Sequence, residues 1–203
     1  MEYLSLTRGG IVGFALFALS CTAQAEQPNS PYGPLDRLLK SKTDSLCFRR
    51  DYNAAHLKRH SGQMTETIML SFRDDGVRIA LKQKDRKAPR YMSASCNWSE
   101  RRNERYPESH PIQAFRKDAG YDCIVIMSPG SAQEGGVVVI DPASDGQSLV
   151  LYIEDSVAVQ DSLSEDRNVL TFNLGREDRQ FRLTRTDAAS CKRMDDGLAS
   201  LGL

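Results

Sequence analysis

Two histidines have the spacing in this sequence that comes closest to a chemical site. His56 and His60 stand four positions apart, so on a helix both imidazoles would face the same way and could take two positions of a zinc or copper site. No third ligand is recognisable nearby: His110 could join only through tertiary folding, and Leu57 stands where the metalloprotease motif has its glutamate. A metal-dependent hydrolase is one alternative function. We favour a helical turn whose histidines cap or pack, and we expect no cofactor.

The nucleophiles and carboxylates of the chain form no recognisable catalytic pattern. Ser131 lacks the second glycine of the hydrolase elbow. The acid pair Asp74-Asp75 falls in a turn-like sequence, where neighbouring side chains point apart and do not converge across a cleft. Phosphate-loop and dinucleotide fingerprints are absent from the sequence. We therefore favour a protein that is not an enzyme.

Residues 1–25 have the features of a signal peptide. Arg8 is basic, an apolar stretch follows it, and Ala23-Gln24-Ala25 fits the small-x-small cleavage pattern. Lipoprotein processing at Cys21 is an alternative, although the aliphatic residue usually found three positions before such a cysteine is missing. No later run reaches the roughly 18 apolar residues of a spanning helix. We expect a periplasmic or secreted protein with no membrane span after signal removal.

Signal cleavage would leave four cysteines, and four in an exported chain favour two structural disulfides. None has the C-x-x-C spacing of a redox or zinc site. Matching Ala-Ser-Cys endings at Cys96 and Cys191 hint at two pseudo-repeated halves. This repeat favours the pairs Cys47–Cys96 and Cys123–Cys191. Two other pairings stay open: Cys47–Cys191 with Cys96–Cys123, and Cys47–Cys123 with Cys96–Cys191.

Short strand-like segments separated by turn residues dominate the chain after residue 45. The segments are 68–72, 77–81, 92–98, 123–127, 137–140, 149–153, 169–174 and 180–185. Asp74-Asp75-Gly76 predicts a tight hairpin turn between the first two. We expect an all-β, antiparallel sandwich or barrel of eight or more short strands, stapled by disulfides. The β-rich domain spans 46–203, with possible halves 46–117 and 118–203, and follows a leader with a short helix at 26–45.

Charge is distributed unevenly along a chain that is neutral as a whole, with 27 basic and 27 acidic residues. Residues 26–117 carry 19 basic and 11 acidic side chains, whereas residues 118–203 carry 7 and 15. Basic groups with nearby aromatic rings can bind anionic polymers. In an exported protein the partner would be an acidic envelope polymer or an acidic protein, and no nucleic acid is expected. The candidate contacts are Lys82, Lys84, Arg86, Lys87, Arg90, Arg101, Arg102 and Arg105. The simpler interpretation is that they decorate the outer face of a sheet.

Two stretches, Cys47–His60 with Asp51-Tyr52 inside it and Asp178–Cys191 with Phe181-Arg182-Leu183 inside it, resemble a group of uncharacterised exported proteins of alphaproteobacteria. The resemblance implies export and brings no activity or site with it. The leading hypothesis is an exported, non-enzymatic binding or envelope-structure protein of unknown ligand. Besides the hydrolase, the alternative is a barrel that holds a small ligand or acts as an inhibitor.

Overall fold

The structure, a computed structural model, describes residues 33–41, 44–74, 76–100, 119–127, 134–154, 156–161, 170–175, 177–192 and 194. The expected signal peptide, with Cys21, lies outside these residues, as do His110 and Ser131. So do three of the candidate basic contacts, Arg101, Arg102 and Arg105.

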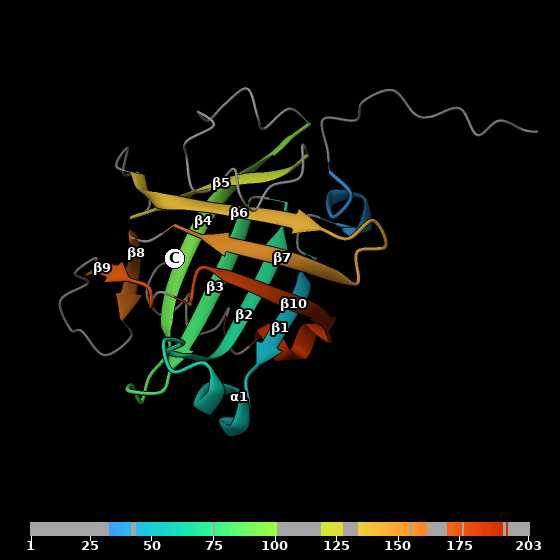
Figure 1. Ribbon diagram of the computed structural model, residues 1–203. Coiled ribbons are helices and arrows are strands. Elements are labelled where there is room, and N and C mark those ends of the chain that lie inside the picture. Colours follow the sequence, from blue (N-terminus) through green and yellow to red (C-terminus); the bar gives the residue numbers. More distant parts are fainter. Residues whose placement is uncertain are drawn as a thin grey trace, which may run out of the picture. The chain divides into compact units, whose positions relative to one another are not determined.

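Strands make up most of the described chain (Figure 1). They are β1 (Leu46–Asp51), β2 (Thr65–Arg73), β3 (Gly76–Gln83), β4 (Arg90–Ser99), β5 (Gly120–Ile126), β6 (Glu134–Pro142), β7 (Ser148–Ile153), β8 (Ser156–Asp161), β9 (Leu170–Asn173) and β10 (Gln180–Thr186). The helical elements are the 3-10 helix η1 (Asp36–Leu38) and α1 (Ala54–Arg59), and residues 188–192 and 194 are also helical. The prediction of an all-β fold is confirmed, and so is the expected helical turn around His56.

The strands close into an antiparallel barrel. Neighbours pair in the order β3-β2-β1-β10-β7-β6-β5-β4, and pairing between β3 and β4 completes the ring. β8 pairs with Arg90 and Tyr91 at the start of β4, whereas β5 pairs with β4 from Ser93 onward. β9 pairs with β8. The structure therefore decides between the two expected architectures in favour of the barrel. Because β4 pairs with β5 and β1 with β10, the segments before and after residue 117 share one wall.

The hairpin between β2 and β3 forms where the sequence predicts it; Asp75 itself lies outside the described residues. β2 ends at Arg73 and β3 begins at Gly76, which faces Arg73 in the register. Gly76 has φ +137°, and a Cβ atom there would collide with the carbonyl oxygen of Ala94 on β4. Glycine is required at this position because only glycine adopts that backbone without strain and leaves room for the neighbouring strand.

Alternate residues of the strands fill the barrel interior. Phe48, Ile68, Ile79 and Leu151 are among the side chains with no exposed surface, and they belong to one contiguous cluster of buried residues. Leu35, just before η1, is equally buried and joins the same cluster, so the N-terminal segment closes one end of the barrel. At the opposite end lie α1 and the turn between β3 and β4; we call this the α1 end (Figure 1).

The chain before β1 is held by one buried hydroxyl. The Tyr121 Oη accepts hydrogen bonds from the backbone N–H groups of Leu35 and Asp36, at 3.0 and 3.3 Å, and donates to Asp36 Oδ2 at 2.7 Å. Burial, followed by the hydrogen bond to Asp36 and its charge, raises the pKa of Tyr121 far above its ordinary value. The phenol therefore stays protonated and keeps donating to Asp36.

The two disulfides exist, but the favoured pairing is wrong. The bonds join Cys47 to Cys191 and Cys96 to Cys123, which is one of the two pairings left open. Cys96 and Cys123 are directly opposite each other on β4 and β5, with Cα atoms 4.0 Å apart. Cys191 follows β10, which lies beside β1 and its Cys47. The repeat suggested halves that close on themselves, whereas the barrel closes by placing the first strand beside the last.

Among the described helices, none has the length and apolar character needed to cross a membrane.

Candidate functional site

One hollow of the described surface lies on the outer face of the barrel, over β1 to β4. The register aligns Arg49 with Met69, Met69 with Ala80, and Ala80 with Tyr91, so these four side chains form one row across the strands. They point outward because their neighbours along each strand, such as Leu70 on β2, fill the core. The small Ala80 between two long side chains leaves a depression in the row.

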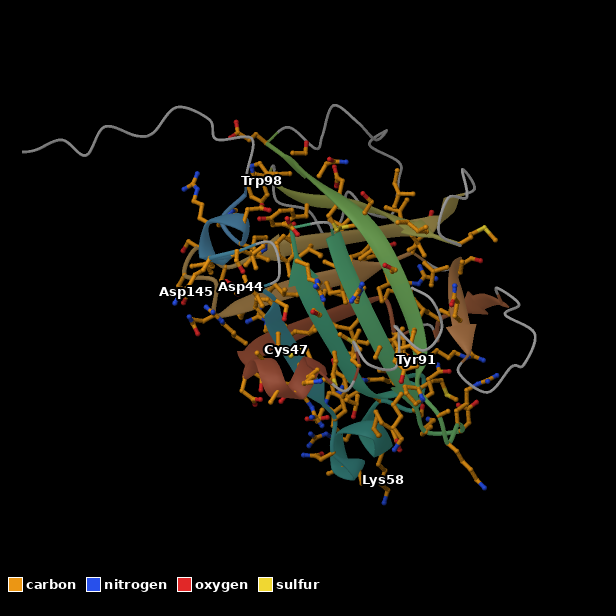
Figure 2. All side chains as sticks on the ribbon, turned by 180° about the vertical axis from the view of Figure 1, so that it is seen from behind. Asp44, Cys47, Lys58, Tyr91, Trp98 and Asp145 are labelled. Carbon is orange, nitrogen blue, oxygen red and sulfur yellow. A yellow bond between two sulfur atoms is a disulfide. The ribbon has the colours of Figure 1, made fainter. Side chains whose placement is uncertain are left out.

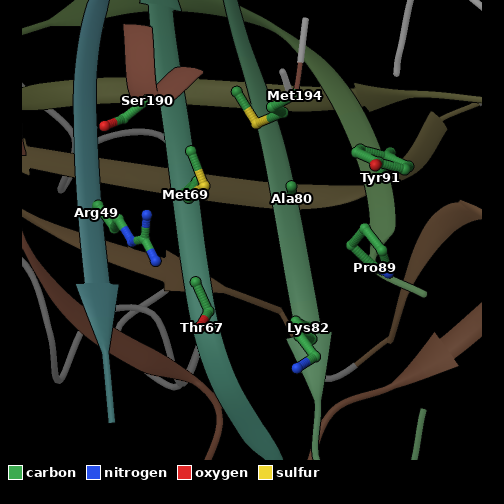
Figure 3. Close-up of a pocket in the computed structure, with 9 residues that line it drawn as sticks. All are labelled: Arg49, Thr67, Met69, Ala80, Lys82, Pro89, Tyr91, Ser190 and Met194. Atoms are coloured by element: carbon green, nitrogen blue, oxygen red, sulfur yellow. The ribbon is translucent and has the colours of Figure 1, made fainter. Parts of the chain in front are cut away.

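The C-terminal helical residues make one wall of this hollow. Ser190 and Met194 lie above the row, and Cys191 fixes them there through its bond to Cys47 (Figure 3). Thr67 on β2 and Lys82 on β3, which pair in the next outward-facing row, form the opposite margin. Together these side chains enclose about 340 Å³; we call the site the outer groove, lined by Arg49, Thr67, Met69, Ala80, Lys82, Pro89, Tyr91, Ser190 and Met194.

Both charged side chains of the outer groove are cations that already contact a carboxylate. Arg49 donates two hydrogen bonds to Asp51, Nε to Oδ2 at 2.8 Å and an Nη to Oδ1 at 2.9 Å. Lys82 Nζ lies 3.2 Å from Glu66 Oε2. Burial alone would raise the pKa of Asp51, but hydrogen bonds from Arg49 and Thr67 and the nearby arginine charges outweigh it and lower that pKa. The groove therefore has an apolar floor and a margin that carries two cations, each paired with a carboxylate.

A second candidate site is a group of exposed cations at the α1 end, Lys58, Arg59, Lys84, Arg86 and Lys87, which we call the basic surface. Figure 2 places Lys58 at this end, with Asp44 and Asp145 away from it. Two hydrogen bonds join the segments that carry the cations: the Lys84 N–H donates to the Met64 carbonyl at 3.0 Å, and the Lys84 side-chain Nζ donates to the Ser61 carbonyl at 3.3 Å. Asp85 is the acid within the same two segments.

The structure separates the candidate basic contacts into groups. Lys82, Lys84, Arg86 and Lys87 are exposed, and Lys82 lies at the boundary between the basic surface and the outer groove. Arg90 is only 7% exposed at the start of β4, so we leave it out of the basic surface. The sequence predicted these cations from charge alone. It showed Lys58 and Arg59 only as neighbours of the two histidines, and the contacts of Lys84 with Ser61 and Met64 bring them to the same end of the barrel.

The two histidines lie together, as their spacing predicts. Asn53 caps α1 by accepting a hydrogen bond from the His56 N–H at 2.8 Å, and the His56 and His60 rings stack with centroids 4.4 Å apart. His56 Nε2 lies 3.0 Å from the side-chain oxygen of Gln63, and His60 Nδ1 lies 3.3 Å from Glu177 Oε2. No group of three His, Cys, Asp or Glu side chains within the described residues is arranged to hold a metal ion. The capping and packing interpretation accounts for every one of these contacts.

We expect protein purified without a histidine tag to contain zinc and copper far below one equivalent. His56 and His60 each have a protein partner, and tetrahedral metal sites need three or four protein ligands. Elemental analysis after dialysis checks this, with the double variant His56→Ala/His60→Ala as control. A stoichiometric metal that the double variant loses would contradict our assignment of the pair.

A buried carboxylate holds the loop between α1 and β2. Asp178 has no exposed surface, and its Oδ2 accepts hydrogen bonds from Met64 N–H at 2.7 Å and Thr65 N–H at 3.1 Å. Burial raises the pKa of Asp178, and these hydrogen bonds only partly offset the effect. Because the Met64 carbonyl accepts from Lys84, the backbone of Met64 connects Asp178 to the basic surface. Sequence reasoning missed this role; the turn residues around Gly175 were the only hint.

No family model, curated protein or solved structure matches this chain. The structure itself defines the class of protein: a closed, disulfide-linked β-barrel with a packed interior and its candidate sites on the outside.

Proposed function

We propose that this protein is an exported, non-enzymatic binding module of the cell envelope, and that its basic surface binds an acidic envelope polymer. The observation that carries the proposal is the assembly of Lys58, Arg59, Lys84, Arg86 and Lys87, from two separate segments, at one end of the barrel. The two disulfides support export, because structural disulfides persist mainly in oxidising compartments outside the cytoplasm.

Close cations on a rigid barrel suit a repeating anion. At physiological ionic strength charges are screened beyond about 8 Å, so only cations held close together act jointly on one polymer. The contacts of Lys84 with Ser61 and Met64 hold the two cationic segments against each other. An anionic polymer can place several charges along this surface at once, whereas a single small anion would contact one or two.

The packing of the barrel supports an external site over an internal one. Side chains from all eight barrel strands enter one buried cluster, and Leu35 closes the end opposite α1. A carrier barrel keeps an interior cavity for its ligand. The described interior is instead occupied by residues such as Phe48, Phe72 and Phe181, so we favour binding on the outside of the wall.

Binding to heparin, used as a probe polyanion, should weaken at least about tenfold when Lys84, Arg86 and Lys87 are changed together to alanine. The matched control is Arg37→Ala/Lys40→Ala/Arg185→Ala, which removes the same charge from exposed positions outside the basic surface. We expect the control to bind within about twofold of the wild type, and all binding to weaken as salt rises. Equal losses in the two triple variants would show that net charge alone attracts the polymer and would remove the proposal.

A further inference from the structure

We propose that the outer groove binds a single-chain amphiphile with a carboxylate head, its alkyl chain lying on the floor and its head at Arg49 and Lys82. This is a second binding site, and it goes beyond the polymer-binding function of the basic surface. It uses different residues, except that Lys82 lies at the boundary of the two sites.

The floor of the groove is shaped for a narrow apolar group. Met69 and Tyr91 flank Ala80 in one row, so the depression over Ala80 has apolar walls on both sides. Met194 covers the row from the C-terminal helical segment (Figure 3). The enclosed volume of about 340 Å³ is at the small end of the range for ligand pockets, which is about 300–1,000 Å³. A groove of this volume accommodates an alkyl chain more readily than the surface of a folded protein.

Two methionines give this floor its adaptability. Met69 is half-buried in the structure, so part of its apolar surface still faces solvent in the groove. Thioether side chains are unbranched and polarizable, and proteins use them where an apolar surface must fit ligands of variable shape. Met194 is only 3% exposed and belongs to one buried cluster with Ala80 and Tyr91, so an alkyl chain in the groove would lie mainly on the exposed part of Met69 and reach Met194 at its edge.

The charges of the groove determine the head group. Arg49 and Lys82 are the charged residues among its lining, and Figure 3 shows them on the same side of the Met69–Met194 pair, with Thr67 between them. Each already contacts a carboxylate, Asp51 for Arg49 and Glu66 for Lys82, which shows that both can accept this group. The four side chains are between 33% and 53% exposed, so exchange of one carboxylate for another costs little.

Methionine methyl NMR with dodecanoate as the probe, kept below its micellar concentration, tests the proposal directly. We expect dodecanoate to shift the Met69 and Met194 methyl signals and to leave Met92, which is buried inside the barrel, unchanged. Decanoate should bind roughly tenfold more weakly, because two fewer methylenes are removed from water. Dodecanol should bind about threefold more weakly than dodecanoate, because it lacks the charge and ion pairs at exposed positions contribute little.

Two variants separate the groove from the basic surface. Arg49→Gln/Lys82→Gln should weaken dodecanoate binding about threefold and leave dodecanol binding unchanged. Ala80→Leu should block both ligands by filling the depression, while heparin binding stays intact. Lys84→Gln, which removes a cation outside the groove lining, is the matched control and should bind dodecanoate like the wild type.

Three results would overturn the proposal. The first is a set of dodecanoate shifts at Met64 or Met92 with none at Met69, which would place the ligand elsewhere. The second is equal affinity of the wild-type protein for dodecanol and dodecanoate, a comparison that does not depend on the folding of any variant. The third is a change of the Met69 and Met194 signals with protein concentration alone, which would mean that a second copy of the chain covers the groove. Loss of heparin binding without any of these would count only against the proposed polymer function.

Discussion

Replacing Cys47 and Cys191 together by alanine should lower the free energy of unfolding by about 5 kcal/mol. The bond joins residues 144 positions apart, and the chain-entropy relation gives about 5 kcal/mol for a loop of that length. The Cys96–Cys123 bond spans 27 positions, and the same relation gives about 3.5 kcal/mol. Denaturant unfolding of the two double variants measures both values.

The two cysteine variants should also differ in ligand binding. Cys191 holds the helical residues that form one wall of the outer groove, so Cys47→Ala/Cys191→Ala should lose dodecanoate binding. Cys96→Ala/Cys123→Ala should retain it, because that bond is not part of the groove. A larger loss of stability from the Cys96–Cys123 variant would contradict the ranking by loop length. Retained dodecanoate binding without Cys191 would contradict its role in the wall.

Asp178→Ala should cost about 3–5 kcal/mol of unfolding free energy. The change leaves the buried N–H groups of Met64 and Thr65 without their acceptor, and hydrogen bonds to a charged group contribute about 1.5–3 kcal/mol each. Asp178→Asn keeps the shape and one acceptor oxygen and should cost less than the alanine variant. Chemical denaturation at neutral pH measures both, and a cost below about 1 kcal/mol for Asp178→Ala would show that water replaces the carboxylate.

The stability difference between the wild type and Asp178→Asn should change with pH in a defined direction. Because the folded-state pKa of Asp178 is raised above its ordinary value of 3.8, the folded protein holds this proton more tightly than the unfolded chain. Its contribution to stability is therefore fully present below about pH 3.8 and declines as the pH rises through the folded-state pKa. The stability advantage of the wild type over Asp178→Asn should therefore shrink as the pH rises above about 3.8. An advantage that grows over this range would mean that the hydrogen bonds outweigh burial.

The strands could be predicted because each carries its own local pattern. Ile68, Leu70 and Phe72 alternate with outward-facing residues, and glycine marks the turn at Gly76, so neither depends on distant parts of the chain. β1 was missed because Arg49-Arg50-Asp51 ends it with three charged residues in succession. β8 was missed although it has the alternating pattern, with Val157 and Val159 buried. The closing of β1 onto β10, and the disulfide pairing that follows from it, depends on the whole barrel.

The candidate sites differ in the same way. The stacking of His56 on His60 follows from their helical spacing, and the cations of the β3–β4 turn are adjacent in sequence. The outer groove could not be predicted, because its floor comes from the register of four strands and its wall from Met194, which follows the last strand. Asp178 was missed for the same reason: its partners at Met64 and Thr65 lie more than a hundred positions earlier.

The most direct test of the central claim, that the basic surface binds an acidic polymer, is a lysine-acetylation footprint of the wild-type protein with and without heparin. Mass spectrometry reports the protection of each lysine without any substitution. We predict protection of Lys58, Lys84 and Lys87, and unchanged reactivity of Lys40 and Lys192, which lie outside the basic surface. Uniform protection of all five lysines, or protection confined to Lys40 and Lys192, would contradict the claim.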